Sequence, residues 1–480
     1  MRPAARRVVV LGGGITGLAA AWELTRAAER EKRQVEVVVL EASERLGGKI
    51  RTESVDGAIV ETGPDSFITT KPEMLELVKE LGLEDELIGT GGLPSVSVVR
   101  GGKLVPMPEG MSLAAPTRII PFALSPLFSL SGKLRMAFEP FVPTRRDGAD
   151  ESLADFTRRR LGAEALDVMV GPMRGGIFAG DPERMSVRST FPQLLDMEKK
   201  GGLARSLWLG GPARAASKSG FTTFMTIKGG LSRVVEVLVK RLPAGTVRVD
   251  HPVETIRRHG GAWEVSGPRG SVSADAVVCA LPAPAAASVL EWTDPELAAR
   301  LREIPFVSTA TATYIWDTAS LPRAPQGFGF LAPRREGLAV TAATFSSSKF
   351  PARAPAGKTV VRAFVGGAGR EEDAEAAVTR VEETVRRELD GLLGLGGVKP
   401  RAAKAARWIK ANPQYNVGHG ERLERLSSCL RGHPGLVLAG SSYTGVGLPD
   451  CVRSGRRAAA AALGHESRRN RAELLFPGLA

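Results

Sequence analysis

Val8-Val9-Val10-Leu11-Gly12-Gly13-Gly14-Ile15-Thr16-Gly17 is the stretch of sequence that decides the fold. Its four large apolar residues predict a buried strand, its glycines predict a tight turn, and residues 18–29 after it predict a helix. In such a unit the glycines allow the turn, let the backbone approach a pyrophosphate and let the helix pack on the strand, while the helix N-terminus supplies N–H donors. The residues expected to hold the pyrophosphate are Gly12, Gly14, Ile15, Thr16 and Gly17.

A second apolar strand, predicted over residues 35–40, makes the glycine pattern specific. Glu41 ends this strand at a distance from the glycines where a carboxylate commonly accepts both hydroxyl protons of a ribose. A glycine-rich turn alone would be weak support, because such turns also occur without any ligand. Together, the strand, turn, helix, second strand and acidic residue predict a dinucleotide-binding βαβ unit.

The N-terminus also has features of a secretory signal peptide, because Arg2, Arg6 and Arg7 precede an apolar run. Three successive glycines favour the strand–turn–helix interpretation, since a signal peptide needs an uninterrupted apolar helix. The longest uncharged stretch elsewhere, residues 119–132, is shorter than the roughly 20 residues that span a bilayer, and prolines interrupt it. We expect no membrane-crossing segment.

The composition excludes some classes of protein. The chain has 480 residues, 43% of them hydrophobic, so it can form two or three globular domains and is not a disordered protein. A formal net charge of +13 favours anionic substrates, nucleic acid or acidic lipid without choosing among them. Its 3 cysteines and 5 histidines are too few and too scattered for a disulfide framework or a metal site, which indicates a reducing, cytoplasmic compartment. For the same reason we expect no metal. No nucleic-acid-binding module is recognisable, so we expect no nucleic-acid partner.

Residues 41–49, Glu-Ala-Ser-Glu-Arg-Leu-Gly-Gly-Lys, resemble the FAD-binding signature of the flavin amine oxidase superfamily. The resemblance implies that FAD is the cofactor and that distant segments complete its site, among them strands predicted over 247–256 and 274–282 and a helix over 451–462. The N-terminus of that helix would stabilise the negative charge of the reduced flavin. The further cofactor-binding residues implied are Ala42, Arg45, Gly47, Gly48, Lys49, Gly63, Pro64, Asp65, Ser66, Val253, Ala280, Trp408, Gly440, Ser441, Val446, Gly447 and Leu448.

Six further segments resemble the protoporphyrinogen/coproporphyrinogen III oxidase family, in order and over almost the whole chain. They are residues 61–67, 175–181, 185–192, 327–330, 413–419 and 443–451. The resemblance implies an FAD enzyme that aromatises a porphyrinogen in haem synthesis, with dioxygen as acceptor and hydrogen peroxide as product. No side-chain base is obvious in these segments, so we expect positioning and cofactor electronics to provide the catalysis. The substrate-binding residues implied are Lys71, Gly176, Ile177, Phe328, Gly329, Leu331 and Tyr415.

The implied fold is α/β with α+β insertions. It combines a Rossmann-like FAD-binding domain, a substrate-binding domain with an antiparallel sheet, and a mostly helical insertion. The FAD-binding domain is expected over residues 1–85, 221–300 and 401–465. The substrate-binding domain is expected over 86–110 and 301–400, and the insertion over 111–220.

Periodicity supplies the local predictions in these regions. Strands are predicted over residues 96–99, 104–107, 308–316, 359–365 and 436–439, and helices over 71–81 and 378–392. Residues 199–220 are rich in glycine, serine, alanine and basic side chains, and are expected to form a mobile loop.

The choice between the two porphyrinogens rests mainly on Val96. Members of the resembled family that act on protoporphyrinogen often carry an arginine there, near the start of the strand before Gly101-Gly102-Lys103-Leu104. The valine, and the similarity of residues 107–110 and 128–133 to soluble enzymes, favour coproporphyrinogen III, whose four propionates would also suit the basic charge. Protoporphyrinogen IX stays the alternative.

Two other interpretations stay open. An amine or carotenoid oxidase of the same superfamily would share the sequence up to Gly48 and the C-terminal FAD segment, although residues 171–192 and 327–330 argue against it. A membrane-surface or nucleic-acid-binding protein would use the positive charge. For the oxidase, the apolar residues 112–131 would allow peripheral contact with the inner membrane surface, and the product would pass to the next enzyme of the haem pathway.

Overall fold

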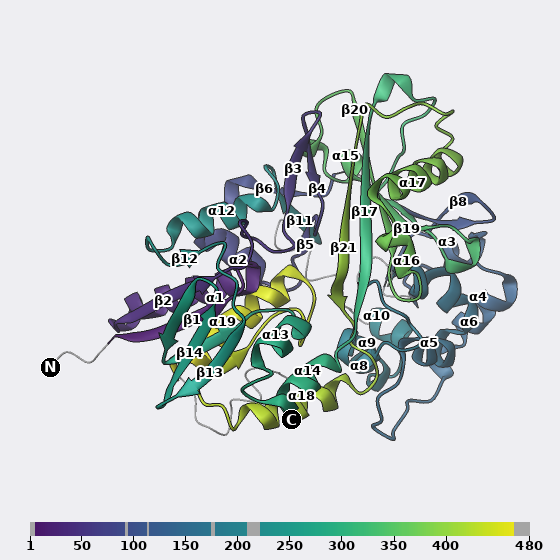
Figure 1. Cartoon of the computed structure of the whole chain (residues 1–480). Helices are drawn as coiled ribbons and strands as arrows, with labels where there is room; N and C mark the ends of the chain where they lie inside the picture. Colours follow the sequence, from purple (N-terminus) through teal and green to yellow (C-terminus); the bar gives the residue numbers. More distant parts are fainter. Residues whose placement is uncertain (1–4, 92–94, 113–114, 174–177, 209–220, 465–480) are drawn as a thin grey trace.

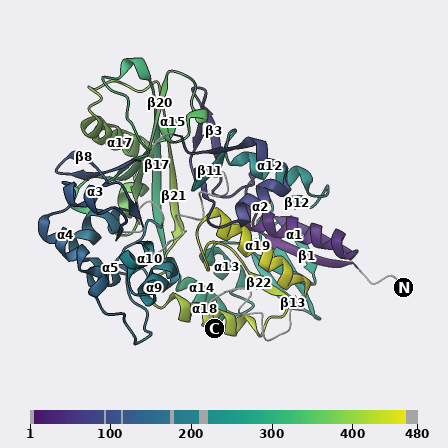
Figure 2. The ribbon, with the colours of Figure 1, turned by 180° about the vertical axis from the view of Figure 1, so that it is seen from behind.

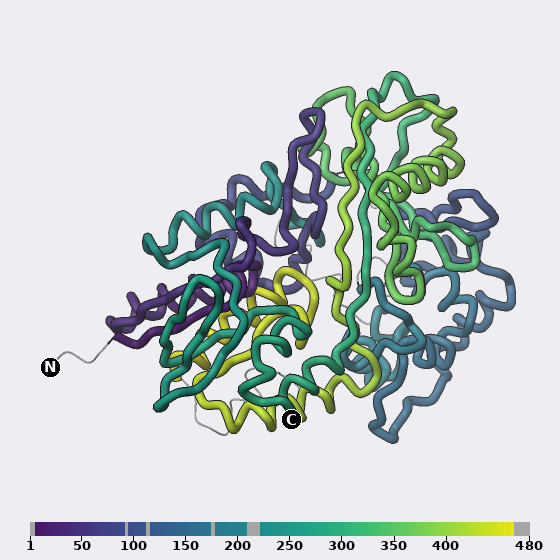
Figure 3. The backbone as a smooth tube through the Cα atoms, viewed as in Figure 1, coloured from purple at the N-terminus to yellow at the C-terminus, as the bar shows by residue number. Residues whose placement is uncertain are grey.

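The computed structural model describes residues 5–91, 95–112, 115–173, 178–208 and 221–464. These residues form three parts, which run from left to right in Figure 1: a parallel sheet with its helices, a group of long antiparallel strands, and a cluster of short helices. The chain passes among these parts several times, as the tube in Figure 3 shows. Among the described residues, no helix is both long enough and apolar enough to cross a bilayer.

A five-stranded parallel sheet carries the first glycine motif. Its strand order is β12-β2-β1-β16-β22, and every neighbouring pair is parallel. The strands are β1 (Arg6–Leu11), β2 (Val35–Leu40), β12 (Val247–Arg248), β16 (Ala276–Cys279) and β22 (Leu436–Leu438). The central strand β1 is buried over residues 8–11, and the strands predicted over 8–11, 35–40 and 436–439 are confirmed.

Two long helices, α1 (Ile15–Glu31) and α19 (Leu448–Leu463), pack against each other beside this sheet (Figure 2). Gly455 allows their close approach, because a Cβ atom there would lie 2.3 Å from the carbonyl oxygen of Thr16. The predicted C-terminal helix is confirmed, but it begins at Leu448 and includes Pro449 in its first turn, where proline is well tolerated. Segments from both ends of the chain therefore meet at the start of α1.

The strand predicted over residues 247–256 is wrong as a single element. The chain leaves the parallel sheet after β12 and enters a separate antiparallel sheet. The strands of that sheet are β13 (Thr255–His259), β14 (Ala262–Gly267) and β15 (Gly270–Ala274). Between these sheets, Asp250 has a left-handed backbone with φ of 49°, and Pro252 has no N–H to donate to a ladder, so residues 249–254 form no strand.

A seven-stranded, mainly antiparallel sheet forms the tall central part of Figure 1. Its order is β21-β17-β20-β19-β18-β7-β8, in which β18 and β7 run parallel. The strands are β7 (Val96–Arg100), β8 (Lys103–Pro106), β17 (Phe306–Asp317), β18 (Gly329–Leu331), β19 (Val340–Phe345), β20 (Lys358–Gly366) and β21 (Ala402–Pro413). The helix α17 (Val378–Leu393) packs on the sheet and buries Val381, Val385 and Leu389. The strands and helix predicted for this part are confirmed.

Two strands pair with strands that the expected domains assign to another domain. Residues 402–413 were assigned to the FAD-binding domain, but β21 pairs along β17 in the antiparallel sheet. Conversely, β6 (Leu87–Gly89) was expected in the substrate-binding domain, but it pairs with β11 (Phe224–Ile227), which also pairs with β5 (Phe67–Ile68). An alternating pattern predicts a strand without indicating which of two sheets the strand joins.

Short helices between residues 119 and 208 form the third part, and its apolar core also includes Val98 and Tyr415 from outside this range. They are α3 (Ile119–Leu124), α4 (Leu130–Ala137), α5 (Leu153–Leu161), α6 (Ala163–Ala165), α8 (Val187–Thr190), α9 (Pro192–Lys199) and α10 (Leu203–Trp208). The helix α10 contradicts the loop expected over 199–220, because Leu203 and Ala204 are buried and hold this segment in place. Residues 209–220 lie outside the described part of the chain.

The remaining helices and strands lie on or between these three parts. They are β3 (Thr52–Val55), β4 (Ala58–Glu61), α2 (Glu73–Glu80), β9 (Met111–Ser112), β10 (Ala115–Pro116), α12 (Ser232–Arg241), α13 (Ala283–Leu290), α14 (Pro295–Arg302), α15 (Ser346–Lys349), α16 (Glu371–Glu375) and α18 (His419–Leu430). The helix α2 confirms the helix predicted over residues 71–81.

Candidate cofactor and substrate site

The turn between β1 and α1 has no room for a side chain at Gly12 or Gly17. Gly12 has a φ of 96°, and a Cβ atom on it would lie 3.1 Å from the carbonyl oxygen of Ala280. A Cβ atom on Gly17 would lie 2.0 Å from the carbonyl oxygen of Gly12, so neither glycine accepts a side chain. The nearest atom to a Cβ on Gly14 would be the Cα of Gly48 at 4.0 Å, so the backbone borders open space at the uncapped start of α1.

Glu41 is held at the end of β2 with its carboxylate beside this turn. Its Oε2 accepts a hydrogen bond from the N–H of Gly13 at 2.6 Å, and its Oε1 accepts from the N–H of Ser43 at 2.9 Å. The carbonyl oxygen of Glu41 accepts from the N–H of His251 at 2.8 Å. The loop between β12 and β13, which contains Val253, is therefore attached next to Glu41. Both residues were expected to bind the cofactor.

The second glycine turn, Gly47-Gly48, is shaped by the guanidinium of Arg45. The guanidinium donates to the carbonyl oxygen of Ile50 at 2.8 Å and also to that of Gly48. The N–H of Gly47 donates to the carbonyl oxygen of Gly13 at 2.8 Å, which joins the two glycine turns. Arg45 thus binds the main chain of its own turn, and that turn lies against the first one.

The loop that follows β4 lies between Lys49 and Trp408. A Cβ atom on Gly63 would lie 1.8 Å from the carbonyl oxygen of Lys49, so the two segments touch. The indole N–H of Trp408 donates to the carbonyl oxygen of Thr62 at 2.8 Å, and the hydroxyl of Thr311 donates to the same oxygen at 3.1 Å. Burial lowers the pKa of the Lys49 ammonium. The contacts of Lys49, Gly63 and Trp408 show that three segments expected at the cofactor are adjacent.

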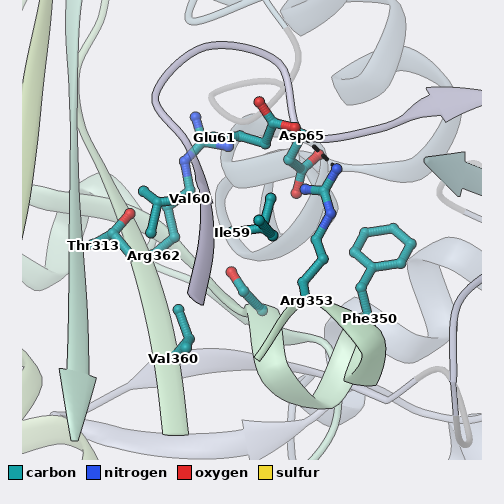
Figure 4. Close-up of a pocket in the computed structure, with 10 residues that line it drawn as sticks. Ile59, Val60, Glu61, Asp65, Thr313, Phe350, Arg353, Val360 and Arg362 are labelled. Atoms are coloured by element: carbon teal, nitrogen blue, oxygen red, sulfur yellow. Dashed lines mark hydrogen bonds and ion pairs between the residues drawn. The ribbon is translucent and has the colours of Figure 1, made fainter. Parts of the chain in front are cut away.

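A cluster of charged side chains lies where this loop meets the antiparallel sheet, and Figure 4 shows four of its members around a small cavity. Its members are Glu61, Asp65, Lys349, Arg353 and Arg362. Glu61 pairs with Arg353 at 3.0 Å, and Asp65 pairs with Lys349 at 3.4 Å. Burial would raise the pKa of Asp65, but Lys349, Arg362 and Arg353 outweigh it and hold that pKa well below its ordinary value. For Glu61 burial prevails and raises the pKa.

The cations of this cluster were not identified from the sequence. Arg362 donates to the carbonyl oxygens of Thr62, at 3.4 Å, and Gly63, so it ties the cofactor loop to β20. Its signal in the sequence was a single charge in the middle of the apolar strand predicted over 359–365. Lys349 and Arg353 had no such signal, because they lie in short, irregular segments after β19.

Residues 440–448 return to the first glycine turn from the far end of the chain. Gly440 has a φ of 121°, and a Cβ atom on it would lie 3.9 Å from the hydroxyl oxygen of Thr16. The helix α19 begins within this segment, and its N-cap residue, Gly447, makes no side-chain cap. An uncapped helix start beside a dinucleotide turn suits an anionic group, because the first N–H groups of a helix point outward without partners. The predicted residues of this segment are Gly440, Ser441, Val446, Gly447 and Leu448.

The substrate residues expected on β18 lie next to Val96. Gly329 pairs with Val96 in parallel register, and Leu331 is half-buried two residues further along the strand. Phe330 lies between them and is buried in the core of the antiparallel sheet. Phe328, which precedes the strand, is half-buried. The strand therefore leaves Gly329 and Leu331 on the face opposite Phe330.

The other predicted substrate residues have different surroundings. Lys71 donates to both carboxylate oxygens of Asp450 at 2.8 Å, although 41% of its side chain stays exposed. Tyr415 is only 1% exposed, so its ring has no surface to offer a substrate. Gly176 and Ile177 lie outside the described residues. Within the described ranges, no group of three or more His, Cys, Asp or Glu side chains could hold a metal ion.

Comparison with known proteins adds to this geometry. The model of a family described as flavin containing amine oxidoreductase matches residues 15–463. The chain is 36% identical to a coproporphyrinogen III oxidase of Bacillus subtilis (strain 168), over 95% of this chain and 98% of that protein. It is 34% identical to the protoporphyrinogen oxidase of Homo sapiens, over 96% of this chain and 99% of that protein. A crystal structure from Exiguobacterium sp. 255-15, with a provisional protoporphyrinogen oxidase name, has a TM-score of 0.85 at 31% identity, covering 96% of this chain and 100% of that one.

Proposed function

The chain belongs to the flavin containing amine oxidoreductase family, and within it we propose that the protein oxidises coproporphyrinogen III to the porphyrin, with dioxygen as electron acceptor. It is an FAD-dependent oxidase. The observation that carries the proposal is the similarity to named porphyrinogen oxidases along almost the whole chain. These names favour a porphyrinogen over the amine or carotenoid substrates considered from the sequence.

The site residues would bind and orient the cofactor. The first glycine turn and the start of α1 would hold the pyrophosphate, Glu41 would hold the ribose, and the start of α19 would face the part that gains charge on reduction. When bound, FAD supplies a two-electron acceptor. In each of three oxidations the substrate would lose a hydride from a meso carbon and a proton from a ring nitrogen. The polypeptide would contribute by orienting the substrate and by excluding water.

Val96 supports the choice of porphyrinogen. It lies beside Gly329, within the surface expected to meet the substrate, and it is apolar where protoporphyrinogen enzymes often carry an arginine. A formal charge of +13 suits a substrate with four propionates better than one with two. We therefore favour coproporphyrinogen III over protoporphyrinogen IX.

We expect the FAD-loaded protein to oxidise coproporphyrinogen III with a kcat/KM at least about tenfold above that for protoporphyrinogen IX, because one altered charged contact changes binding by roughly 1–3 kcal/mol. Porphyrin fluorescence, followed in parallel for both substrates, measures the ratio. Val96→Arg should shift it toward protoporphyrinogen IX, whereas Val105→Arg, on the neighbouring strand β8, controls for the added charge. A preference of the unaltered protein for protoporphyrinogen IX contradicts the substrate choice, and amine oxidation without porphyrinogen turnover contradicts the proposal.

We further propose that the helical insertion contacts an anionic membrane surface. Large apolar side chains are exposed along α3, α4 and the short turn at residues 139–141. They are Ile119, Ile120, Leu124, Leu130, Leu134, Phe138 and Phe141. Arg118 and Lys133 lie in the same segments, and a mixture of exposed apolar and basic side chains is typical of helices that lie on lipid. Attachment there would keep a poorly soluble porphyrin close to the enzyme that receives it.

A vesicle flotation assay tests the membrane contact. We expect the protein to float with vesicles that contain phosphatidylglycerol and to float much less with neutral phosphatidylcholine vesicles. The double substitution Leu124→Glu and Phe141→Glu should weaken binding at least about tenfold, because it places two charges at the apolar boundary. Trp292→Glu is the control, since this side chain is also exposed but lies after α13. Equal flotation of the double variant and of Trp292→Glu would contradict the proposed membrane contact.

A further inference from the structure

Tyr415 and His419 form a stacked pair behind the loop of residues 441–445 that leads into α19. Their ring centroids are 4.3 Å apart and their planes are inclined by 17°. Each residue is 1% exposed. Tyr415 lies between β21 and α18, and His419 is the first residue of α18. The pair belongs to the 413–419 segment, whose role neither the cofactor contacts nor the substrate surface explains.

Hydrogen bonds from this pair reach both ends and the middle of the loop. The hydroxyl of Tyr415 donates to the carbonyl oxygen of Ser441 at 2.6 Å and accepts from the N–H of Gly445 at 2.8 Å. The Nε2 of His419 lies 2.8 Å from the carbonyl oxygen of Tyr443. Because a carbonyl oxygen only accepts, Nε2 carries the proton in the neutral ring. One phenol and one imidazole therefore bind three main-chain groups of the loop.

The position of this loop determines where α19 begins. A Cβ atom on Gly445 would lie 2.4 Å from the Cγ of Asp450, so the loop folds directly onto the first turn of the helix. The hydroxyl of Ser442 accepts from the N–H of Ala283 at 3.0 Å, which fastens the loop to the start of α13, the helix that follows β16. A shift of the loop would therefore move the helix start relative to the parallel sheet.

We propose that Tyr415 and His419 are positioning residues that fix the start of α19 at the flavin site, so that its N–H groups stabilise the negative charge of the reduced cofactor. This role replaces the substrate contact expected for Tyr415, whose ring is buried. The inference rests on the FAD site of the proposed function and not on the identity of the substrate.

The environment of His419 supports a fixed tautomer. Its Nδ1 is buried and has no hydrogen-bond partner among the described residues. Burial lowers the pKa of the ring to about 4, so the ring is neutral near pH 7. Phe178 packs edge-on against Tyr415, with ring centroids 6.1 Å apart. The donor on Nε2 is thus held toward the loop, and the stack is enclosed.

Tyr415→Phe tests the proposal, because it keeps the ring and removes both hydrogen bonds of the hydroxyl. We expect the Kd of oxidised FAD to rise about tenfold, because the loop loses two hydrogen bonds. The Kd of reduced FAD should rise about a hundredfold, because the displaced helix start also stabilises the negative charge of the reduced flavin less well. The midpoint potential of the bound flavin then falls. Reconstitution of the apoprotein followed by flavin fluorescence measures the Kd, and dye-linked reductive titration of the holoprotein measures the potential.

Tyr314→Phe is the matched control. Tyr314 is also 1% exposed, and its hydroxyl also donates to a main-chain carbonyl, that of Glu382 at 2.5 Å, but it lies on β17. This variant should keep the FAD Kd within about twofold and leave the potential unchanged. His419→Leu should behave like Tyr415→Phe, and His419→Gln, which keeps an N–H donor, should recover part of the potential.

Two results would overturn the positioning role. One is an unchanged Kd and potential in both Tyr415→Phe and His419→Leu, and the other is an equal change in Tyr314→Phe. Neither measurement needs a porphyrinogen, so a failure of the proposed substrate would leave this test intact.

Discussion

Replacing Glu139 with alanine should lower the free energy of unfolding of the helical insertion by about 3–5 kcal/mol. Glu139 and Arg160 are both 1% exposed, and Oε1 of Glu139 accepts from the Nε of Arg160 at 2.9 Å and from the N–H of Leu203 at 2.9 Å. Its Oε2 accepts from the N–H of Ala204 at 3.1 Å. Without the carboxylate, the guanidinium stays buried, and Glu198 at 3.7 Å compensates only part of its charge.

Apart from Val98 and Tyr415, the buried members of the insertion's apolar core come from residues 119–208, so the effect should be local. We expect faster amide hydrogen exchange in peptides from residues 119–208, measured by mass spectrometry, while the flavin absorption of the holoprotein is retained. Glu109→Ala is the control, because Glu109 pairs with Arg118 at 2.7 Å on the exposed surface just before this part of the chain, and such pairs contribute at most about 1 kcal/mol. Equal exchange in the two variants, or loss of flavin together with the insertion, would contradict this prediction.

The parallel sheet and its glycine turns were predictable because their signals are local. A Cβ atom on Gly17 would meet the carbonyl oxygen of Gly12, five residues earlier, and Gly12 itself has a positive φ. Both requirements arise within one short stretch, so the sequence shows the motif. The two strands that it joins pair as immediate neighbours, as expected for a βαβ unit. The expectations for distant segments came from resemblance to a family, because no local pattern links those segments to the first glycine turn.

The partners of charged and aromatic side chains were not predictable, because they depend on contacts between remote segments. Lys71 was expected to meet the substrate, but it pairs with Asp450, which lies 379 residues away in the chain. Arg362 binds the carbonyl oxygen of Gly63 across 299 residues. Tyr415 belongs to a family motif, and a motif does not distinguish a residue that touches substrate from one that supports a loop. Such assignments require the fold.

Acidification from pH 6.5 to 4 should lower the free energy of unfolding of the protein by about 3 kcal/mol more than that of the His419→Gln variant. The pKa of His419 is lowered to about 4 in the folded protein, chiefly by burial and also by Arg422, whereas Asp150 and Glu421 act in the opposite direction. The unfolded chain protonates this histidine near pH 6.5. Between these two pH values the unfolded state binds a proton that the folded state does not, so stability present above pH 6.5 is lost as the pH falls.

Urea unfolding at several pH values between 4 and 7, followed by far-ultraviolet circular dichroism, measures this difference. Near pH 7 the glutamine variant should be the less stable protein, because it lacks the stack on Tyr415. The difference in free energy of unfolding between the two proteins should then decrease as the pH falls. Glutamine does not titrate, so only the unaltered protein loses stability through protonation at residue 419. A gap that stays constant over the range would mean that the ring accepts its proton without cost, and that burial of Nδ1 is not what keeps the imidazole neutral.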